Sequence, residues 1–180
     1  MENTTQQNSP IKVGDYVKFE NGGVEGIYEV ISVNLRHNSC TIKDYYSTYS
    51  VSVKSVEKVD EPYFIDCDWF HTEDETWHGD LGYEADIDDM YCETLDEVKS
   101  GIKYDLEAME ENGELNDNEI IRFSAVKGVY DFESECWRCP CLFDRENHDR
   151  DRENRVVYRY LNATKDVAEK YGIIADEYAE

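Results

Sequence analysis

Both the residue pattern and the charge of this chain change at Asp60-Glu61-Pro62. Before this point, short segments in which apolar and polar residues alternate are separated by turn residues. After it, some segments keep this strand-like alternation, another has apolar residues at helical spacing, and acidic residues become concentrated. Pro62 cannot donate a backbone hydrogen bond, and it disfavours helical backbone at Glu61. We therefore expect a flexible tail at 1–10 and two folding units, 11–60 and 61–180.

The first unit reads as a set of short strands near period two, which are IKVGDYVKF, GIYEVISVN, SCTIKD and YSVSVKSVEKV. Turn residues separate them at Gly14-Asp15, Asn21-Gly22-Gly23 and His37-Asn38. Four or five such strands predict a small all-β barrel. The VGDYVKF opening, the GxYxVxxV strand and the closing VxxVxKV resemble SH3-like barrels of the KOW and Tudor type. That resemblance implies this fold and a tendency to bind other macromolecules.

The second unit begins with YFIDCDWF at 63–70, which alternates as a strand, and continues through an acidic loop at 72–92. A helix is then predicted, because Thr94 and Glu97 have the spacing of a capping box and Gly113 is placed to end it. Between these signals, apolar residues recur at helical spacing, namely Leu95, Val98, Ile102, Leu106 and Met109.

The remainder of the second unit predicts a strand at 119–126 that turns at Lys127-Gly128 into a second strand at 129–132. A further strand is expected at 155–161, and a short helix at 163–171 that ends at Gly172. The order strand, helix, hairpin, strand, helix predicts an acidic α+β domain after the N-terminal all-β barrel.

The charge is concentrated in one stretch of the second unit. Between Glu61 and Glu135 there are 24 acidic and four basic residues, so this stretch holds −20 of the formal charge of −24. The first sixty residues have 8 acidic and 6 basic residues. A concentrated patch of one sign destabilises the folded state by self-repulsion. A strongly basic partner would offset this cost, and surfaces built to hold nucleic acid are strongly basic.

The candidate partner-binding residues are the carboxylates that fall in groups along this stretch. On a helix that rises about 1.5 Å per residue, or on a loop beside it, carboxylates can approach the charge density of duplex DNA, about one charge per 1.7 Å. The alternative is an ordinary solvated surface that keeps the protein soluble. The candidates are Glu73, Asp74, Glu75, Glu84, Asp86, Asp88, Asp89, Asp96 and Glu97.

Other chemistries have weaker patterns. Cys136, Cys139 and Cys141, with His148, could hold zinc, but no second C-x-x-C completes the pattern, and reduced thiols near a turn at Pro140 are the alternative. Two groups, Asp66-x-Asp68 and Asp86-x-Asp88-Asp89, offer oxygen ligands for a hard cation, although the second does not fit an EF-hand loop. No nucleotide-binding or hydrolase motif is present in the sequence. We therefore expect no cofactor and no enzyme activity.

In size and charge the chain is similar to phage-encoded anti-restriction and anti-CRISPR proteins. The similarity implies an inhibitor that mimics nucleic acid, binds the DNA- or RNA-binding groove of a bacterial defence nuclease and blocks target DNA binding. A Cas9-type nuclease is an attractive target, because its duplex-holding surface is basic. The acidic face itself should not bind DNA or membranes.

Two alternatives remain open. One is a non-catalytic adaptor that binds proteins through the barrel, and the other is a metal-dependent hydrolase or nuclease that uses the Asp-x-Asp groups. The polar N-terminus shows no secretory signal, and no apolar run reaches membrane-span length. The expected location is the bacterial cytoplasm. A homo-oligomer is left open.

Overall fold

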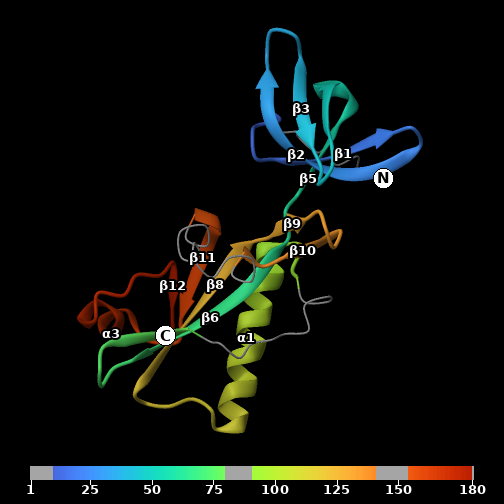
Figure 1. The fold of residues 1–180 in the computed structure, drawn as a ribbon. Coiled ribbons are helices and arrows are strands. Elements are labelled where there is room, and N and C mark those ends of the chain that lie inside the picture. The colour runs from blue at the N-terminus through green and yellow to red at the C-terminus, as the bar shows by residue number, and fades with distance from the viewer. Residues whose placement is uncertain (1–9, 80–90, 141–153, 180) are drawn as a thin grey trace, which may run out of the picture. The chain divides into compact units, whose positions relative to one another are not determined.

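The computed structural model describes residues 10–79, 91–140 and 154–179, and the chain divides into two compact units. The first unit is Met1–Glu61 together with Phe132–Ser134, and the second is Pro62–Asp131 with Glu135–Glu180. Both units have more of their described residues in strands than in helices, and the α-helices α1 and α3 belong to the second unit (Figure 1). The fold class is therefore α+β with mainly sheet.

The first unit is one antiparallel sheet in the order β4-β3-β2-β1-β5. Gly22 and Gly23 form the two-residue turn between β1 and β2, with φ of 64° and 88°. Left-handed backbone at both positions fits the twist of a hairpin and favours glycine. The core is built from Val17, Val30 and Ile42. The elements are β1 (Tyr16–Asn21), β2 (Val24–Asn34), β3 (Ser39–Lys43), β4 (Thr48–Ser52), the short 3₁₀ helix η1 (Val53–Ser55) and β5 (Glu57–Val59).

The second unit has a five-stranded sheet in the order β12-β11-β8-β6-β7. Its neighbouring strands are antiparallel, except that β11 and β12 are parallel. β8 is central and pairs with β6 along its whole length. The strands are β6 (Tyr63–His71), β7 (Thr76–Gly79), β8 (Glu119–Lys127), β11 (Val156–Leu161) and β12 (Glu177–Tyr178), and a separate two-stranded sheet joins β9 (Val129–Asp131) to β10 (Cys136–Arg138).

The predicted hairpin between residues 119–126 and 129–132 is wrong. β8 is flanked by β6 and β11, whereas β9 pairs with β10. Gly128 donates its backbone N–H to the carbonyl of Pro62, 2.8 Å away. A Cβ at Gly128 would lie 2.8 Å from the ring of Phe64, so the glycine permits close packing against the start of β6.

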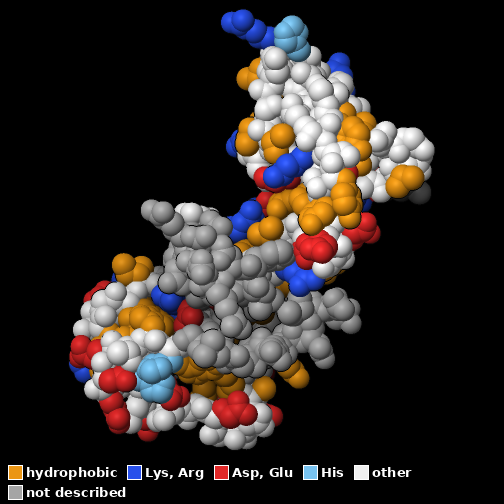
Figure 2. All heavy atoms as spheres, in the orientation of Figure 1, with side chains coloured by type: hydrophobic (Ala, Val, Ile, Leu, Met, Phe, Trp, Pro, Cys, Tyr) orange, Lys and Arg blue, Asp and Glu red, His pale blue; other side chains and the backbone are white. Residues whose placement is uncertain are grey.

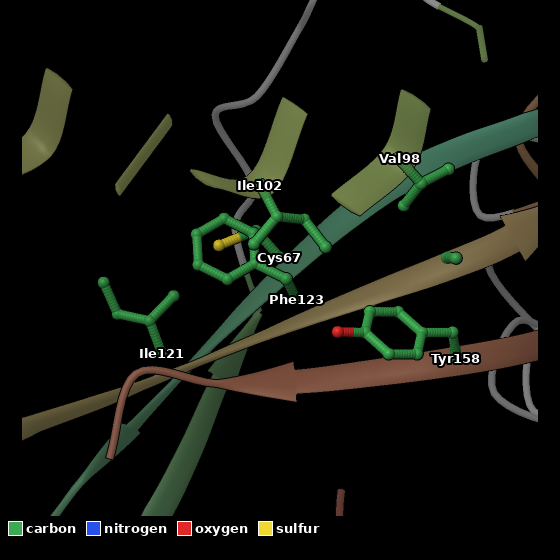
Figure 3. Close-up of a cluster of buried hydrophobic side chains, with 7 residues drawn as sticks. Cys67, Val98, Ile102, Ile121, Phe123 and Tyr158 are labelled. Atoms are coloured by element: carbon green, nitrogen blue, oxygen red, sulfur yellow. The ribbon is translucent and has the colours of Figure 1, made fainter. Parts of the chain in front are cut away.

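The predicted helix is confirmed as α1 (Leu95–Asn112). Thr94 Oγ1 accepts from the backbone of Glu97, the Glu97 carboxylate accepts from the backbone of Thr94, and Gly113 ends the helix at φ 69°. α1 covers one face of the sheet (Figure 3). There the side chains of Val98 and Ile102 face those of the strands, among them Cys67, Ile121, Phe123 and Tyr158.

A second core lies at one end of the opposite face of the sheet. Phe70, Ile120 and Leu161 come from three strands, and Ala168 comes from the short helix α3 (Lys165–Lys170). Gly172, at φ 68°, follows this helix, close to the end predicted from the sequence. Both faces of the sheet therefore bury apolar side chains.

Candidate functional site

The turn after β6 and the loop after α1 lie together at one end of the second unit. His71, the last residue of β6, pairs with Glu119, the first residue of β8. Beyond this pair, the Thr72 N–H donates to the Asn118 carbonyl at 2.9 Å. Asn118 Nδ2 donates to Glu73 Oε1 at 2.8 Å. The loop at 113–118 connects the C-terminal end of α1 to this region (Figure 1).

Exposed carboxylates lie on three parts of this unit, namely the β6–β7 turn, the last turn of α1 and the loop that connects α1 to β8. Among the described residues, no Lys or Arg nitrogen lies within 4.0 Å of any of them. Figure 2 shows red carboxylate side chains at the lower left of the view and, separate from them, at the bottom. We call the group the acidic end, and its members are Glu73, Asp74, Glu75, Glu110, Glu111, Glu114 and Asp117.

The helix itself makes the acidic end unfavourable for folding. The C-terminus of an α-helix carries a partial negative charge, and a carboxylate there typically costs about 0.3–1 kcal/mol at low salt. Glu110 and Glu111 occupy the last turn of α1, where no basic residue is present. These two side chains are exposed, so they add no core packing in return. Folding alone gives no reason for them.

Two histidines border the acidic end. The rings of His71 and His78 meet edge to face, with centroids 4.2 Å apart. His71 Nδ1 lies 3.6 Å from Glu119 Oε1, and His78 Nε2 lies 3.7 Å from Asp74 Oδ2. The pKa of Asp74 is lowered, mainly because the Thr76 hydroxyl donates to its carboxylate and further because both histidines lie near. Asp74 is therefore held in its charged form.

The structure separates the predicted carboxylates into groups. Glu73, Asp74 and Glu75 belong to the acidic end, whereas Asp96 and Glu97 lie in the first turn of α1. A helix of 18 residues is about 27 Å long, so these two groups lie at opposite ends of the unit. Glu97 also accepts from the backbone N–H of Glu93 at 2.8 Å, which commits its carboxylate to the helix cap. Glu84, Asp86, Asp88 and Asp89 lie outside the described residues.

Four members of the acidic end were not among the predicted site residues, namely Glu110, Glu111, Glu114 and Asp117. A signal for Glu110 and Glu111 was present in the sequence, because cations are favoured at the C-terminal end of a helix and the last turn of this helix has acidic residues and no basic one.

The structure adds no support for the zinc and hard-cation sites among the residues that it describes. Cys136 lies on β10 and Cys139 is buried directly after it, while Cys141 and His148 lie outside the described residues. Asp68 is buried and accepts from Arg122 at 2.9 Å, so its charge is already compensated. In the part of the chain that is described, no three His, Cys, Asp or Glu side chains are placed to share a metal ion.

Two further findings concern membrane-spanning helices and similarity to known proteins. No helix among the described residues is long and apolar enough to cross a bilayer. Comparison of the chain with models of protein families, with curated proteins and with solved structures finds no match. Its function must therefore be inferred from its own charges, surfaces and hollows.

Proposed function

We propose that this protein is a non-catalytic inhibitor that mimics nucleic acid and binds the nucleic-acid groove of a larger basic enzyme. The observation that carries the proposal is the acidic end, whose seven exposed carboxylates lie on the β6–β7 turn, the last turn of α1 and the loop after it, without a Lys or Arg partner among the described residues. A cationic groove would relieve both their mutual repulsion and the unfavourable charge at the end of α1.

The carboxylates would act as a group. Exposed ion pairs contribute only about 0.2–1 kcal/mol each, whereas several pairs that lose water together in a channel can contribute several kcal/mol. Neighbouring residues on a helix differ by about 1.5 Å along its axis, which is close to the 1.7 Å per charge of duplex DNA. Glu110 and Glu111, at consecutive positions of α1, present charges at this scale.

The target class we propose is a bacterial defence nuclease of the RNA-guided, Cas9 type, with the protein acting in the bacterial cytoplasm. Such enzymes hold a heteroduplex in a positively charged channel, and they read a short DNA motif with arginines. Occupation of that channel by the acidic end would block the binding of target DNA. Charge complementarity would also speed association at low salt.

For the first unit we propose an SH3-like barrel of the KOW and Tudor type. Its support is a run of five short antiparallel strands around one core, in which β5 returns to pair with β1. This arrangement fits a small, partly open barrel. In the proposed inhibitor, this unit supplies a second contact with the target.

A second candidate function, a protein-binding adaptor, is favoured by the loop between β3 and β4. Tyr45 and Tyr46 are 57% and 88% exposed, and their rings meet edge to face at 4.8 Å. Asp44 holds the loop by accepting from the backbone of Tyr46 and Ser47. A fixed pair of exposed aromatic side chains suits a protein contact, since tyrosine is enriched at interfaces.

A displacement experiment tests the mimic. A labelled target duplex is bound to a Cas9-type nuclease loaded with guide RNA, and this protein is added over a series of salt concentrations. We expect displacement that weakens steeply as salt rises, because exposed charge interactions are screened over about 8–10 Å at physiological salt. Displacement that is insensitive to salt would instead favour apolar docking through Tyr45 and Tyr46.

The same displacement experiment also tests the predicted carboxylates that lie outside the described residues. Replacing Asp86, Asp88 and Asp89 together by Asn removes three charges at nearly constant volume. If these residues belong to the contact, displacement should weaken and its salt dependence should become shallower. If neither this variant nor a variant of the acidic end changes displacement, the acidic segment is a solvated surface and the mimic proposal fails.

A further inference from the structure

A hollow of about 260 Å³ opens in the second unit, and its lining has the opposite charge to the acidic end. Arg122 of β8 and Arg159 of β11 line it, with Trp77 of β7 beside them. The chain that follows α3 contributes Tyr171 and Ile174. None of the described residues that line the hollow is acidic, although the chain as a whole has a formal charge of −24.

Arg122 is held in place by its neighbours. Its Nε and Nη2 donate to Asp68 Oδ2 at 3.3 and 2.9 Å, and its guanidinium lies 4.0 Å from the centre of the Trp77 ring. Asp68 is only 6% exposed, so this pair is largely screened from water. A guanidinium has five N–H donors. Two are used here, and the other three have no hydrogen-bond partner in the described part of the chain.

A fixed guanidinium with open donors suits an oxyanion, because its planar fork matches carboxylate and phosphate oxygens. Arg159 supplies a second guanidinium in the same hollow. The other lining residues include Trp77, which is 39% exposed, and Ile174, which is 80% exposed. Hollows that combine apolar side chains with a few placed polar groups can bind small molecules.

We infer that this hollow binds an organic oxyanion, a carboxylate or phosphate attached to an apolar or aromatic group. Arg122 holds the anionic group through its open donors, the positive charge of Arg159 adds to the attraction, and the apolar group lies against Trp77 and Ile174. This function is separate from the proposed mimicry, which uses carboxylates elsewhere on the unit to bind cations. Either can hold without the other.

The test is a titration with phenyl phosphate, benzoate and inorganic phosphate, followed by the NMR signal of the Trp77 indole and by calorimetry. We expect saturable binding of phenyl phosphate or benzoate, and weaker binding of inorganic phosphate because it lacks an apolar group. Preference between the two organic probes distinguishes phosphate from carboxylate ligands. Absence of a saturable shift at Trp77, or equal affinity for inorganic phosphate and phenyl phosphate, would overturn the inference.

Two matched substitutions locate the binding. Ile174→Glu places a carboxylate at the rim of the hollow on an exposed side chain, and it should weaken binding about tenfold by repulsion. Val167→Glu adds the same charge on α3, at a position that is 41% exposed and does not line the hollow. It should change the affinity by less than about twofold. Equal effects of the two substitutions would contradict binding in the hollow.

Discussion

The two ends of helix α1 carry the same kind of side chain with opposite consequences. At the N-terminal end, Asp96 and Glu97 face the positive end of the helix dipole, and Glu97 completes the capping box. At the C-terminal end, Glu110 and Glu111 face the negative end of the dipole with no basic residue in the last turn. The first pair of carboxylates stabilises the helix, whereas the second destabilises it. The proposed binding role would account for the second pair, because a basic partner would offset the cost.

The first unit provides the same contrast on a larger scale. There Lys58 Nζ lies 2.8 Å from Asp15 Oδ1, and Lys43 Nζ lies 3.1 Å from Glu29 Oε2. Carboxylates of the first unit are therefore partly neutralised by their own fold. Those of the acidic end, within the described residues, have no such cation within 4.0 Å.

The largest expected effect comes from the middle of α1. Ile102→Ala should destabilise the protein by about 2–5 kcal/mol, because it leaves a cavity in the core between the helix and the sheet. Chemical denaturation measures this loss. Tyr104→Ala, at a side chain that is 71% exposed on the same helix, should change stability by less than about 0.5 kcal/mol. Similar losses at both positions would mean that α1 does not pack as described.

A substitution at the N-terminal end of α1 should cause a smaller loss of stability. Thr94→Ala removes the side-chain oxygen that accepts from Glu97 N at 3.2 Å, and it should cost about 1 kcal/mol. Thermal unfolding followed by circular dichroism measures the change. If Thr94→Ala leaves the stability unchanged, the capping box does not stabilise α1. The contrast between the two ends of the helix would then fail.

The C-terminal end should respond in the opposite direction. Replacing Glu110 and Glu111 by Gln should leave the protein as stable or stabilise it by about 0.3–1 kcal/mol for each charge removed. The gain should shrink as salt is raised, because the dipole interaction is screened. Thermal unfolding at low and high salt measures both effects. A clear loss of stability would show that these carboxylates have a folding role.

The smallest effect concerns Asp105, which lies between the two ends and is partly buried. Burial raises the pKa of its carboxyl above the usual value. The folded state therefore binds a proton more tightly than the unfolded state. Stability from this group is greatest below the ordinary Asp pKa of about 3.9 and is lost as pH rises through the folded pKa. The Asp105→Asn variant has no carboxyl to ionise at this position, so it should not lose this stability as pH rises. In denaturation curves, its free energy of unfolding should therefore exceed that of the wild type by more at neutral pH than at acid pH.

The helix could be predicted from the sequence because its signals are local. Thr94, Glu97 and Gly113 act within one turn of the ends that they define, and the apolar residues between them repeat at helical spacing. Strand pairing is not local. Lys127-Gly128 has the form of a turn, yet Gly128 packs against Phe64 far away in the sequence, and β9 pairs with β10.

The acidic end and the hollow also depend on strand pairing, which is not local in the sequence. The concentration of acid was visible in the sequence, but its grouping depends on the register that sets His71 opposite Glu119. That register brings the β6–β7 turn beside the loop after α1 and leaves Asp96 at the far end of the helix. The hollow with Arg122 and Arg159 combines three strands and the chain after α3, so no local pattern could predict it.

The most direct test of the central claim measures binding and stability on the same variants. One variant replaces Glu110, Glu111 and Glu114 by Gln, and the control replaces Glu20, Glu25 and Glu57, which are exposed in the first unit, by Gln. Each removes three charges, and each is assayed for displacement of duplex DNA from a Cas9-type nuclease and for thermal stability. We predict that the first variant loses displacement strongly while its stability is unchanged or higher, and that the control retains displacement. Equal displacement by the two variants, or a loss of stability in the first, would contradict the claim that the acidic end is kept for binding.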